Sequence, residues 1–165
     1  MSFKNRLLQT LSTLFTSSMS QKNDYVIFTD GAYSSSRKQG GSSFVILKDG
    51  ELIREWAQTW KGGTNNTAEM LAIICALRVF KKPVDSITIY SDSQYCLGCI
   101  FKDWKRRKNV KLWEIFDNEF ERVKQLCPNI QGIHIDGHQK DKSFETKWNN
   151  YCDRLAVNAS KETVE

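Results

Sequence analysis

Residues 25–32 read Tyr-Val-Ile-Phe-Thr-Asp-Gly-Ala, so an apolar stretch typical of a β-strand ends abruptly in an acid and a glycine. This places one carboxylate, Asp30, at the end of a strand, on backbone that can bend sharply. Three more acids, Glu69, Asp92 and Asp153, occur in similarly special settings. Four carboxylates brought together would repel one another strongly unless they held divalent cations. The sequence therefore predicts a metal-dependent enzyme.

The size and composition are typical of one ordinary soluble domain. The chain has 165 residues, of which 40% are hydrophobic and 26% are charged, which is enough for a core of its own. The formal net charge of +5 fits a polyanionic partner without proving one. The sequence holds no apolar run near the roughly 20 residues that a membrane-spanning helix needs, so we expect no membrane partner.

The cysteines indicate a reducing compartment. There are five of them, an odd number, and no secretory signal precedes them. We therefore expect an intracellular protein, cytoplasmic by default. Cys96 and Cys99 have the spacing of a redox motif, but they fall inside a predicted helix and have no second pair, so we interpret them as buried apolar side chains.

The first 24 residues differ from the rest of the chain. Residues 1–21 contain Lys4 and Arg6 but no acid, and apolar side chains between residues 7 and 15 fall on one helical face. This chemistry resembles an organellar targeting segment. A short surface helix or a flexible tail is the interpretation that we favour. We therefore expect an extension over residues 1–24, a single domain over residues 25–160, and a tail over residues 161–165.

The pattern within the domain predicts five strands and four helices in the order βββαβααβα. Strands are predicted at 25–29, 42–47 and 51–60, with a hairpin turn at Lys48-Asp49-Gly50, and then at 86–91 and 130–135. Helices are predicted at 67–80, 93–104, 110–126 and 146–160. Three antiparallel strands followed by strands joined through helices form a mixed α/β sheet covered by helices.

Each acid also has an explanation that involves no metal. Asp30 closes the first strand and is placed to make a turn, and Glu69 completes the pattern of a capping box that begins at Asn66. Asp92 precedes a helix, where it is placed to act as a cap, and Asp153 is explained equally as a solvated helix position. Residue patterns alone therefore stop at an acidic metal site.

Five motifs together resemble ribonuclease H of type 1. They occur in the order of that family and span residues 24–160: Thr29-Asp30-Gly31, Thr64-Asn65-Asn66-Thr67-Ala68-Glu69, Ser91-Asp92-Ser93-Gln94-Tyr95, Gly137-His138 and Cys152-Asp153-Arg154-Leu155-Ala156. The resemblance implies the ribonuclease H-like fold, a five-stranded mixed sheet with helices on both faces. It also implies endonucleolytic cleavage of the RNA strand of an RNA–DNA hybrid.

The same resemblance assigns the catalytic centre. It implies that Asp30, Glu69, Asp92 and Asp153 hold two Mg²⁺ ions, with Mn²⁺ as a substitute, and that hydrolysis leaves a 5′-phosphate and a 3′-hydroxyl. It gives His138 a part in proton transfer or product departure, although the loop between His138 and Asp153 is longer than in a compact family member. His134 lies inside a predicted strand, so we expect it to be structural.

Further matched positions imply contacts with a hybrid duplex. By resemblance, side chains at Asn65, Asn66 and Gln94 reach the minor groove, where the 2′-hydroxyl distinguishes RNA from DNA. The remaining substrate-binding candidates resemble phosphate-binding, backbone-binding or site-orienting positions, and they are Gly31, Thr64, Trp104, Lys105 and Asn149. Trp104 is followed by the basic run of residues 105–108, which suits contact with a phosphate backbone.

Several other functions stay open at this point. A catalytically silent hybrid-binding domain would share the substrate positions, but all four acids are present. Integrases, transposases and resolvases share the fold, but the residues of their motifs differ from those found here. A separated domain of a reverse transcriptase is a further alternative. We expect a stand-alone monomer whose partner is an RNA–DNA hybrid.

Overall fold

The molecule is built on one five-stranded mixed sheet. The computed structural model describes residues 21–164, so most of the predicted extension over residues 1–24 lies outside the described residues. The strand order is β3-β2-β1-β4-β5, which confirms the predicted mixed sheet. The first three strands pair antiparallel, and β4 and β5 run parallel to β1. The strands are β1 (Asp24–Ser34), β2 (Gln39–Lys48), β3 (Glu51–Lys61), β4 (Ser86–Ser91) and β5 (Ile130–His134).

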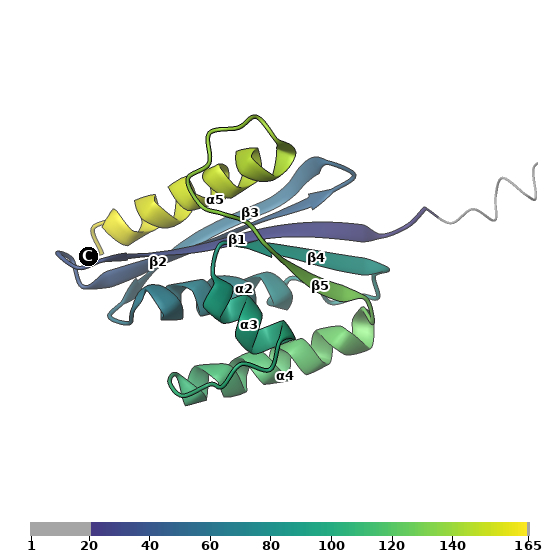
Figure 1. Cartoon of the computed structure of the whole chain (residues 1–165), viewed down its shortest axis with the longest axis horizontal. Helices are drawn as coiled ribbons and strands as arrows, with labels where there is room; N and C mark the ends of the chain where they lie inside the picture. The colour runs from purple at the N-terminus through teal and green to yellow at the C-terminus, as the bar shows by residue number, and fades with distance from the viewer. Residues whose placement is uncertain (1–20, 165) are drawn as a thin grey trace, which may run out of the picture.

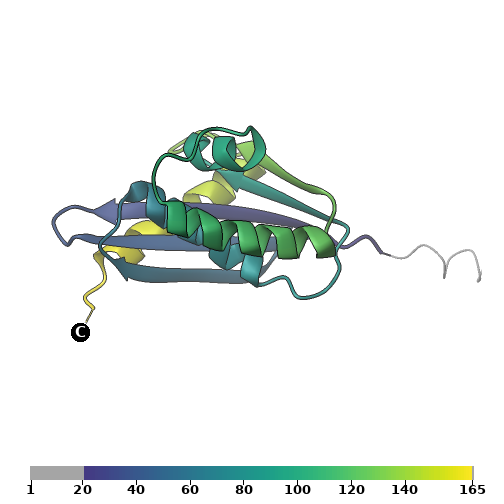
Figure 2. The same cartoon turned by 90° about the horizontal axis from the view of Figure 1, so that it is seen from below.

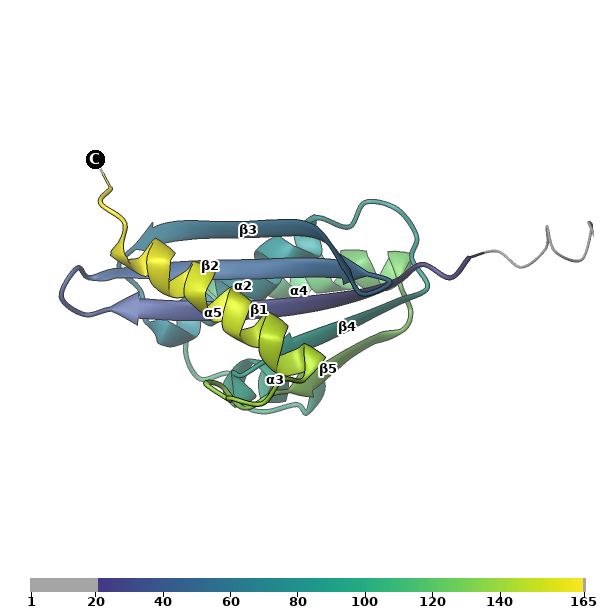
Figure 3. The same ribbon diagram turned by 90° about the horizontal axis from the view of Figure 1, so that it is seen from above.

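Helices cover both faces of this sheet, as predicted. They are α2 (Asn65–Arg78), α3 (Gln94–Phe101), α4 (Val110–Leu126) and α5 (Phe144–Lys161). Figure 1 shows α5 above the sheet and the other three helices below it. Seen from above, α5 runs obliquely across β2 and β1 (Figure 3), and seen from below, α4 forms the outer layer of the opposite face (Figure 2). Among residues 21–164, no helix combines the length and the apolar character required to cross a bilayer.

Two hydrophobic cores follow from the alternation of side chains along the strands. Ile27 of β1 faces α2 and joins the larger core with Leu77 and Phe116, whereas its neighbour Phe28 faces α5 and packs with Trp148 in the smaller core. Successive side chains of a strand point to opposite faces, so one strand serves both cores. The central strand β1 is consequently buried from both sides.

The first strand is longer than predicted, and this changes the setting of Asp30. We expected Asp30 to close the strand, but β1 continues to Ser34 and Asp30 lies within it. The parallel pairing with β4 ends at Phe28 opposite Tyr90, whereas the antiparallel pairing with β2 continues to Ser34 opposite Gln39. Asp30 therefore lies just beyond the point where one neighbouring strand ends, which leaves room for its carboxylate.

The helix caps also differ from the predicted ones. The N-cap of α2 is Thr64, whose hydroxyl accepts a hydrogen bond from the backbone N–H of Thr67 while the Thr67 hydroxyl accepts one from the N–H of Thr64. The predicted capping box from Asn66 to Glu69 is therefore wrong, and Glu69 is a buried residue one turn further on. Ser93 caps α3, so the proposed capping role of Asp92 is wrong as well. Neither Glu69 nor Asp92 therefore caps a helix, as the sequence patterns had suggested.

The C-terminal end of α5 is fastened to the edge of the sheet. Gln39 on β2 donates from its side-chain amide to the carbonyl oxygens of Ser160 (2.9 Å) and Glu162 (2.7 Å). Thr59 on β3 donates to the carbonyl oxygen of Ala159 at 2.7 Å. These bonds satisfy carbonyl groups that a helix end leaves without intrahelical partners. They hold α5, and with it Asp153, in one position over the sheet.

The cysteines behave as buried apolar side chains, in agreement with the sequence-based interpretation. Cys96 and Cys99 are buried and are not joined by a disulfide. Burial raises the pKa of the Cys96 thiol to about 12. The thiol therefore stays protonated at neutral pH, which makes it a poor nucleophile and a poor metal ligand.

Arg122 ties α4 to the end of α2, and its loss should destabilise the fold. Its guanidinium donates to the carbonyl oxygens of Phe80 (2.6 Å) and Leu77 (3.1 Å) and pairs with Glu119. We expect Arg122→Met to lower the free energy of unfolding by about 2 kcal/mol, because it leaves backbone acceptors without their charged donor. Urea denaturation measures this loss.

Arg78→Met is the matched control for this prediction. Arg78 contacts the same Glu119 carboxylate at 3.2 Å, but 52% of its side chain is exposed. Its loss should cost about 0.5 kcal/mol or less, as for most surface ion pairs. Equal losses for the two variants would contradict the role given to the backbone hydrogen bonds.

Candidate active site

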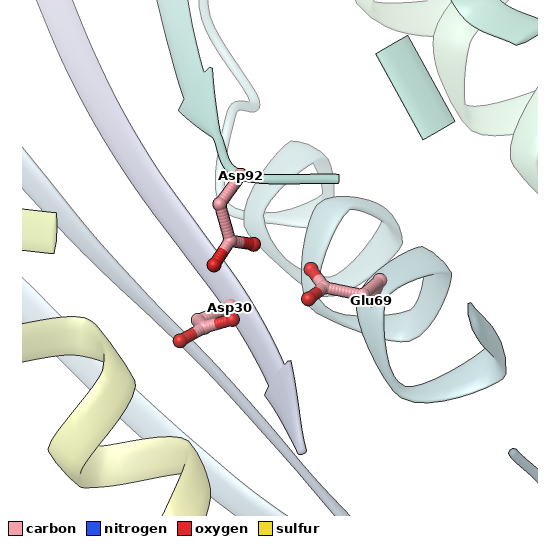
Figure 4. A group of neighbouring side chains, drawn as sticks. All are labelled: Asp30, Glu69 and Asp92. Atoms are coloured by element: carbon pink, nitrogen blue, oxygen red, sulfur yellow. The ribbon is translucent and has the colours of Figure 1, made fainter. Parts of the chain in front are cut away.

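Three carboxylates from separate elements converge beside the middle of the sheet. Asp30 lies within β1, Glu69 lies on α2, and Asp92 directly follows β4. In Figure 4 their oxygens point toward a common space. One carboxylate oxygen from each residue lies within 4.8 Å of those of the other two. This is the spacing of groups that share a ligand, and the ligands that a carboxylate trio suits best are hard cations.

Gly31 allows this convergence because it brings α2 against β1. A Cβ atom placed on Gly31 would lie 2.5 Å from the carbonyl carbon of Ala68 and 2.8 Å from the Cα atom of Glu69. Ser42 on β2 secures the same contact by donating from its hydroxyl to the carbonyl oxygen of Ala68 at 2.6 Å. Only glycine permits so close an approach of a helix backbone to a strand. The position of Glu69 therefore depends on the residue next to Asp30.

Burial makes the three acids reluctant to ionise when no cation is bound. Asp30 is 2% exposed and Glu69 is 3% exposed. Burial, followed by the charge of Asp92, raises the pKa of Asp30 to about 8. Burial and then the charges of Asp30 and Asp92 raise the pKa of Glu69 well above its usual range. Burial also raises the pKa of Asp92. The cluster is thus held in an electrostatically unfavourable state that a positive charge would relieve.

Two carboxylate oxygens of the cluster are buried away from water, and no protein group donates a hydrogen bond to them. Within the described part of the chain, Asp30 Oδ2 and Glu69 Oε2 are buried and accept no hydrogen bond. The other Asp30 oxygen, Oδ1, accepts a hydrogen bond from the N–H of Gly31 at 2.8 Å. Unpaired buried carboxylate oxygens are costly unless another ligand meets them. The donor set therefore fits hard divalent cations such as Mg²⁺.

The fourth acid and the predicted histidine line the same cleft. The cleft has a volume of about 520 Å³, and Asp153 on α5 and His138 in the loop before α5 both contribute to its wall. Asp153 lies outside the group of three acids with the closest oxygens. Its charge contributes to raising the pKa of Asp30. The structure thus brings all four predicted acids and His138 to one cavity, with three of the acids in the tightest arrangement.

Comparison with known proteins now assigns the chain to a family. The model of the RNase H family matches residues 22–161. The chain belongs to the ribonuclease H family. Similar proteins include the ribonuclease H of Clostridium botulinum, which is 30% identical over 153 residues, covering 83% of this chain and 95% of that protein. The ribonuclease H of Syntrophus aciditrophicus is 32% identical over 154 residues, covering 88% and 85%.

Solved ribonuclease H structures share the fold. LC11-RNase H1, solved in complex with an RNA/DNA hybrid, superposes with a TM-score of 0.67 at 25% identity, covering 82% of this chain and 95% of that one. RNase H1 from the archaeon Halobacterium salinarum gives a TM-score of 0.66 at 23% identity, covering 82% and 96%. These superpositions confirm the ribonuclease H-like fold that the motifs implied.

The substrate-binding positions predicted by resemblance fall into three groups. Gly31, Asn65, Asn66 and Gln94 line the acidic cleft itself. Trp104 and Lys105 line two smaller neighbouring hollows of about 220 and 190 Å³, and these hollows share Gln94 and Asn66 with the cleft. The predicted residues around the cleft therefore follow one continuous surface of this member of the ribonuclease H family.

The remaining two positions, Thr64 and Asn149, lie apart from the cleft lining. Thr64 is the N-cap of α2 and so fixes the start of the helix that carries Asn65, Asn66 and Glu69. Asn149 is 2% exposed, and its Oδ1 atom accepts no hydrogen bond within the described residues. From the sequence, Asn149 was placed only by its position four residues before Asp153 on the same side of the helix, and its polar side chain gave no sign of burial.

Sequence reasoning missed several residues of the cleft wall. Tyr33, Tyr95 and Val157 line it together with Ser93. Tyr95 is the last residue of the motif Ser91-Asp92-Ser93-Gln94-Tyr95. Its hydroxyl accepts a hydrogen bond from the indole N–H of Trp113 at 3.3 Å. Tyr33 followed the strand that was predicted to end at residue 29. Recognising that the strand continues would have placed Tyr33 beside the acids.

Proposed function

We propose that this protein is an endonuclease that hydrolyses the RNA strand of RNA–DNA hybrids. The observation that carries the proposal is the convergence of Asp30, Glu69 and Asp92, with buried oxygens that lack protein partners. Membership of the ribonuclease H family supports it, as does the likeness to a relative solved with an RNA/DNA hybrid. All the acids come from a single chain, so we propose that a monomer is sufficient for activity.

We propose that Asp30, Glu69, Asp92 and Asp153 hold two Mg²⁺ ions, for which Mn²⁺ can substitute. Such a pair of ions supplies activation of the attacking water and stabilisation of the leaving oxygen, which leaves a 5′-phosphate and a 3′-hydroxyl. The contribution of the chain is to present ionisable oxygens at fixed positions along a cleft in which Asp30 and Glu69 are almost fully buried. His138, at the wall of the cleft, is placed to exchange protons with the product end or to assist its departure.

Hybrid recognition is proposed for the polar side chains beside the acids. Asn65, Asn66 and Gln94 carry amide groups that can bond base edges and ribose hydroxyls in a minor groove without demanding a sequence. Lys105 lines a hollow that also contains Arg107 and Lys108, and these charges suit a phosphate backbone. Trp104, which is 46% exposed, offers an aromatic surface next to them. The hollow that Lys105 lines shares Asn66 with the acidic cleft, so we expect a duplex held by these charges to reach the acids.

A cleavage assay on three duplexes tests this function. Labelled RNA–DNA hybrid, double-stranded RNA and double-stranded DNA are each incubated with the protein in Mg²⁺ or in a chelator. We expect cleavage of the RNA strand of the hybrid alone, and only with the metal. Cleavage that persists in chelator, or that prefers either of the other duplexes, would overturn the proposal.

Metal binding should stabilise the fold more at high pH than at low pH. The pKa of Asp30 is about 8 in the folded protein, against 3.8 for a free aspartate side chain. The folded state therefore holds a proton that the unfolded state has lost across this window, so stability from this carboxyl falls as pH rises through it. A cation must displace that proton, so it competes poorly at low pH.

The measurement is the melting temperature with and without Mg²⁺. We expect a rise of at least about 5 °C on adding saturating Mg²⁺ near pH 9 and a rise of less than about 2 °C near pH 6. Asp30→Asn should remove most of the difference between the two conditions. An equal rise at both values in the wild-type protein would contradict a cation site built on protonated carboxyls.

A further inference from the structure

The loop that carries His138 is exposed but is fixed at its beginning. It follows β5, and the N–H of Ile135 donates to the carbonyl oxygen of Ser91 at 3.0 Å, directly before Asp92. Gly137 then passes so close to the acids that a Cβ atom on it would lie 2.9 Å from Asp92 Oδ2. His138 itself has a positive φ of 57°, which is uncommon for a residue other than glycine. The histidine thus has a defined backbone conformation next to the acidic cluster.

The far end of the loop is closed by an acid before α5. Asp141 Oδ1 accepts a hydrogen bond from the N–H of Ser143 at 2.8 Å, and Asp141 Oδ2 accepts one from the Thr146 hydroxyl at 3.1 Å. Ser143 in turn caps α5 by accepting from the N–H of Thr146. These contacts fix residues 141–146. They do not reach the stretch that holds His138.

One side chain bridges this remaining gap. Asn150, on the second turn of α5, donates from Nδ2 to the carbonyl oxygen of Gln139 at 3.0 Å. The acceptor is a backbone carbonyl, so the partner must be the amide nitrogen of Asn150 and not its oxygen. Gln139 is the immediate neighbour of His138, and it also donates to the carbonyl oxygen of Gly137 at 3.5 Å. Among the hydrogen bonds of residues 21–164, the bond from Asn150 is therefore the one that joins residues 137–140 to the helix carrying Asp153.

We propose that Asn150 is a positioning residue that holds His138 at the wall of the acidic cleft through its hydrogen bond to the Gln139 carbonyl. This inference rests on the proposed function, because it gives His138 a part in turnover. An isolated loop segment with a positive φ residue has competing conformations of similar energy. A single net hydrogen bond of ordinary strength shifts such an equilibrium by roughly fivefold. That shift is small for the whole fold but decides how often His138 faces the cleft.

The kinetic test uses single and double variants on labelled hybrid. We expect Asn150→Ala to lower kcat about fivefold while KM changes less than about twofold. Asn150→Asp should behave in the same way, because a carboxylate of the same shape cannot donate to a carbonyl oxygen. His138→Ala should lower kcat roughly 100-fold, and adding Asn150→Ala to it should have no further effect. Asn158→Ala, an exposed asparagine on the same helix, is the matched control and should match the wild type.

Three kinetic results would overturn the proposal. The first is an Asn150→Ala variant with the kcat of the wild type. The second is an additive loss of kcat in the double variant, since the bond would then act on something other than His138. The third is an Asn150→Asp variant with full activity, which would show that no donated bond is needed.

A measurement independent of activity separates this inference from the proposed function. Backbone ¹⁵N order parameters of residues 138 and 139 should fall from about 0.8 to about 0.6 in Asn150→Ala and stay unchanged in Asn158→Ala. Absence of hybrid cleavage by the wild type would defeat the function while leaving this result readable. Unchanged order parameters in Asn150→Ala would defeat the positioning role alone.

Discussion

Asp92→Asn is expected to lower the rate of hybrid cleavage by well over 100-fold. Losing a group that only supports a metal ligand typically costs 10- to 100-fold in metal affinity or activity, so losing a ligand itself should cost more than the upper end of that range. Asp92 is the least enclosed of the three converging acids, and its substitution by the isosteric amide removes charge without removing volume. Initial rates on labelled hybrid at saturating Mg²⁺ measure the effect.

Unfolding is not expected to account for this loss. The charge of Asp92 raises the pKa of both Asp30 and Glu69, so neutralising it relieves repulsion in the metal-free protein. The melting temperature of Asp92→Asn in chelator should therefore equal or exceed that of the wild type. Asp49→Asn, at the exposed hairpin turn with a φ of 53° that asparagine tolerates, is the matched control and should keep full activity. Near-normal cleavage by Asp92→Asn would remove the basis for the metal centre.

Gly31→Ala is expected to have the largest effect on stability, and to reduce activity as well. The new methyl group would meet the backbone of Ala68 and Glu69. Backbone atoms of a helix cannot move aside by changing a rotamer, so α2 itself must shift. We expect the free energy of unfolding to fall by about 3 kcal/mol, at the upper end of the cost of overpacking. Urea denaturation gives the stability, and hybrid cleavage under native conditions gives the activity.

Gly50→Ala provides the comparison for Gly31→Ala. Gly50 has a φ of 77°, and no atom lies within 4 Å of the position that a Cβ atom would take there, so only backbone strain opposes the substitution. That strain should cost roughly 1–2 kcal/mol and leave the cleavage rate unchanged. The two variants thus separate strain from displacement of α2. A Gly31→Ala protein as stable and as active as Gly50→Ala would show that the close approach is unimportant.

The sequence was sufficient for the order of the elements but not for the point at which neighbouring strands stop pairing. Strand 86–91 and helix 110–126 were predicted with the bounds that the structure has. Apolar periodicity marks both elements within their own segments, and the Cys127-Pro128 pair marks the end of the helix. The setting of Asp30 depends on β4, which stops pairing with β1 at Phe28, whereas β2 stays paired with β1 as far as Ser34. Because β4 lies more than 50 residues further along the chain, the residues around Asp30 carry no signal of where its pairing stops.

In the candidate site, too, the sequence identified residues but not the contacts that bring them together. The four acids were found through motifs, and the structure places all of them on one cleft. The closeness of Asp30 and Glu69 depends on Gly31 and Ser42, and nothing at position 42 of the sequence points to α2. The burial of Asn149 and the bond from Asn150 to Gln139 likewise depend on how α5 lies over the sheet. Contacts between distant segments decide these features, and periodicity within a segment does not report them.

The attachment of α5 to the opposite face from the other helices has a consequence for biosynthesis. The core under α2, α3 and α4 can close once β5 has left the ribosome, whereas Phe28, Val45 and Leu47 stay uncovered until α5 follows. A nascent chain at that stage exposes an apolar surface that is prone to aggregation, and it lacks Asp153. We expect it to depend on chaperone protection and to be unable to cleave a hybrid until the last helix packs on the sheet.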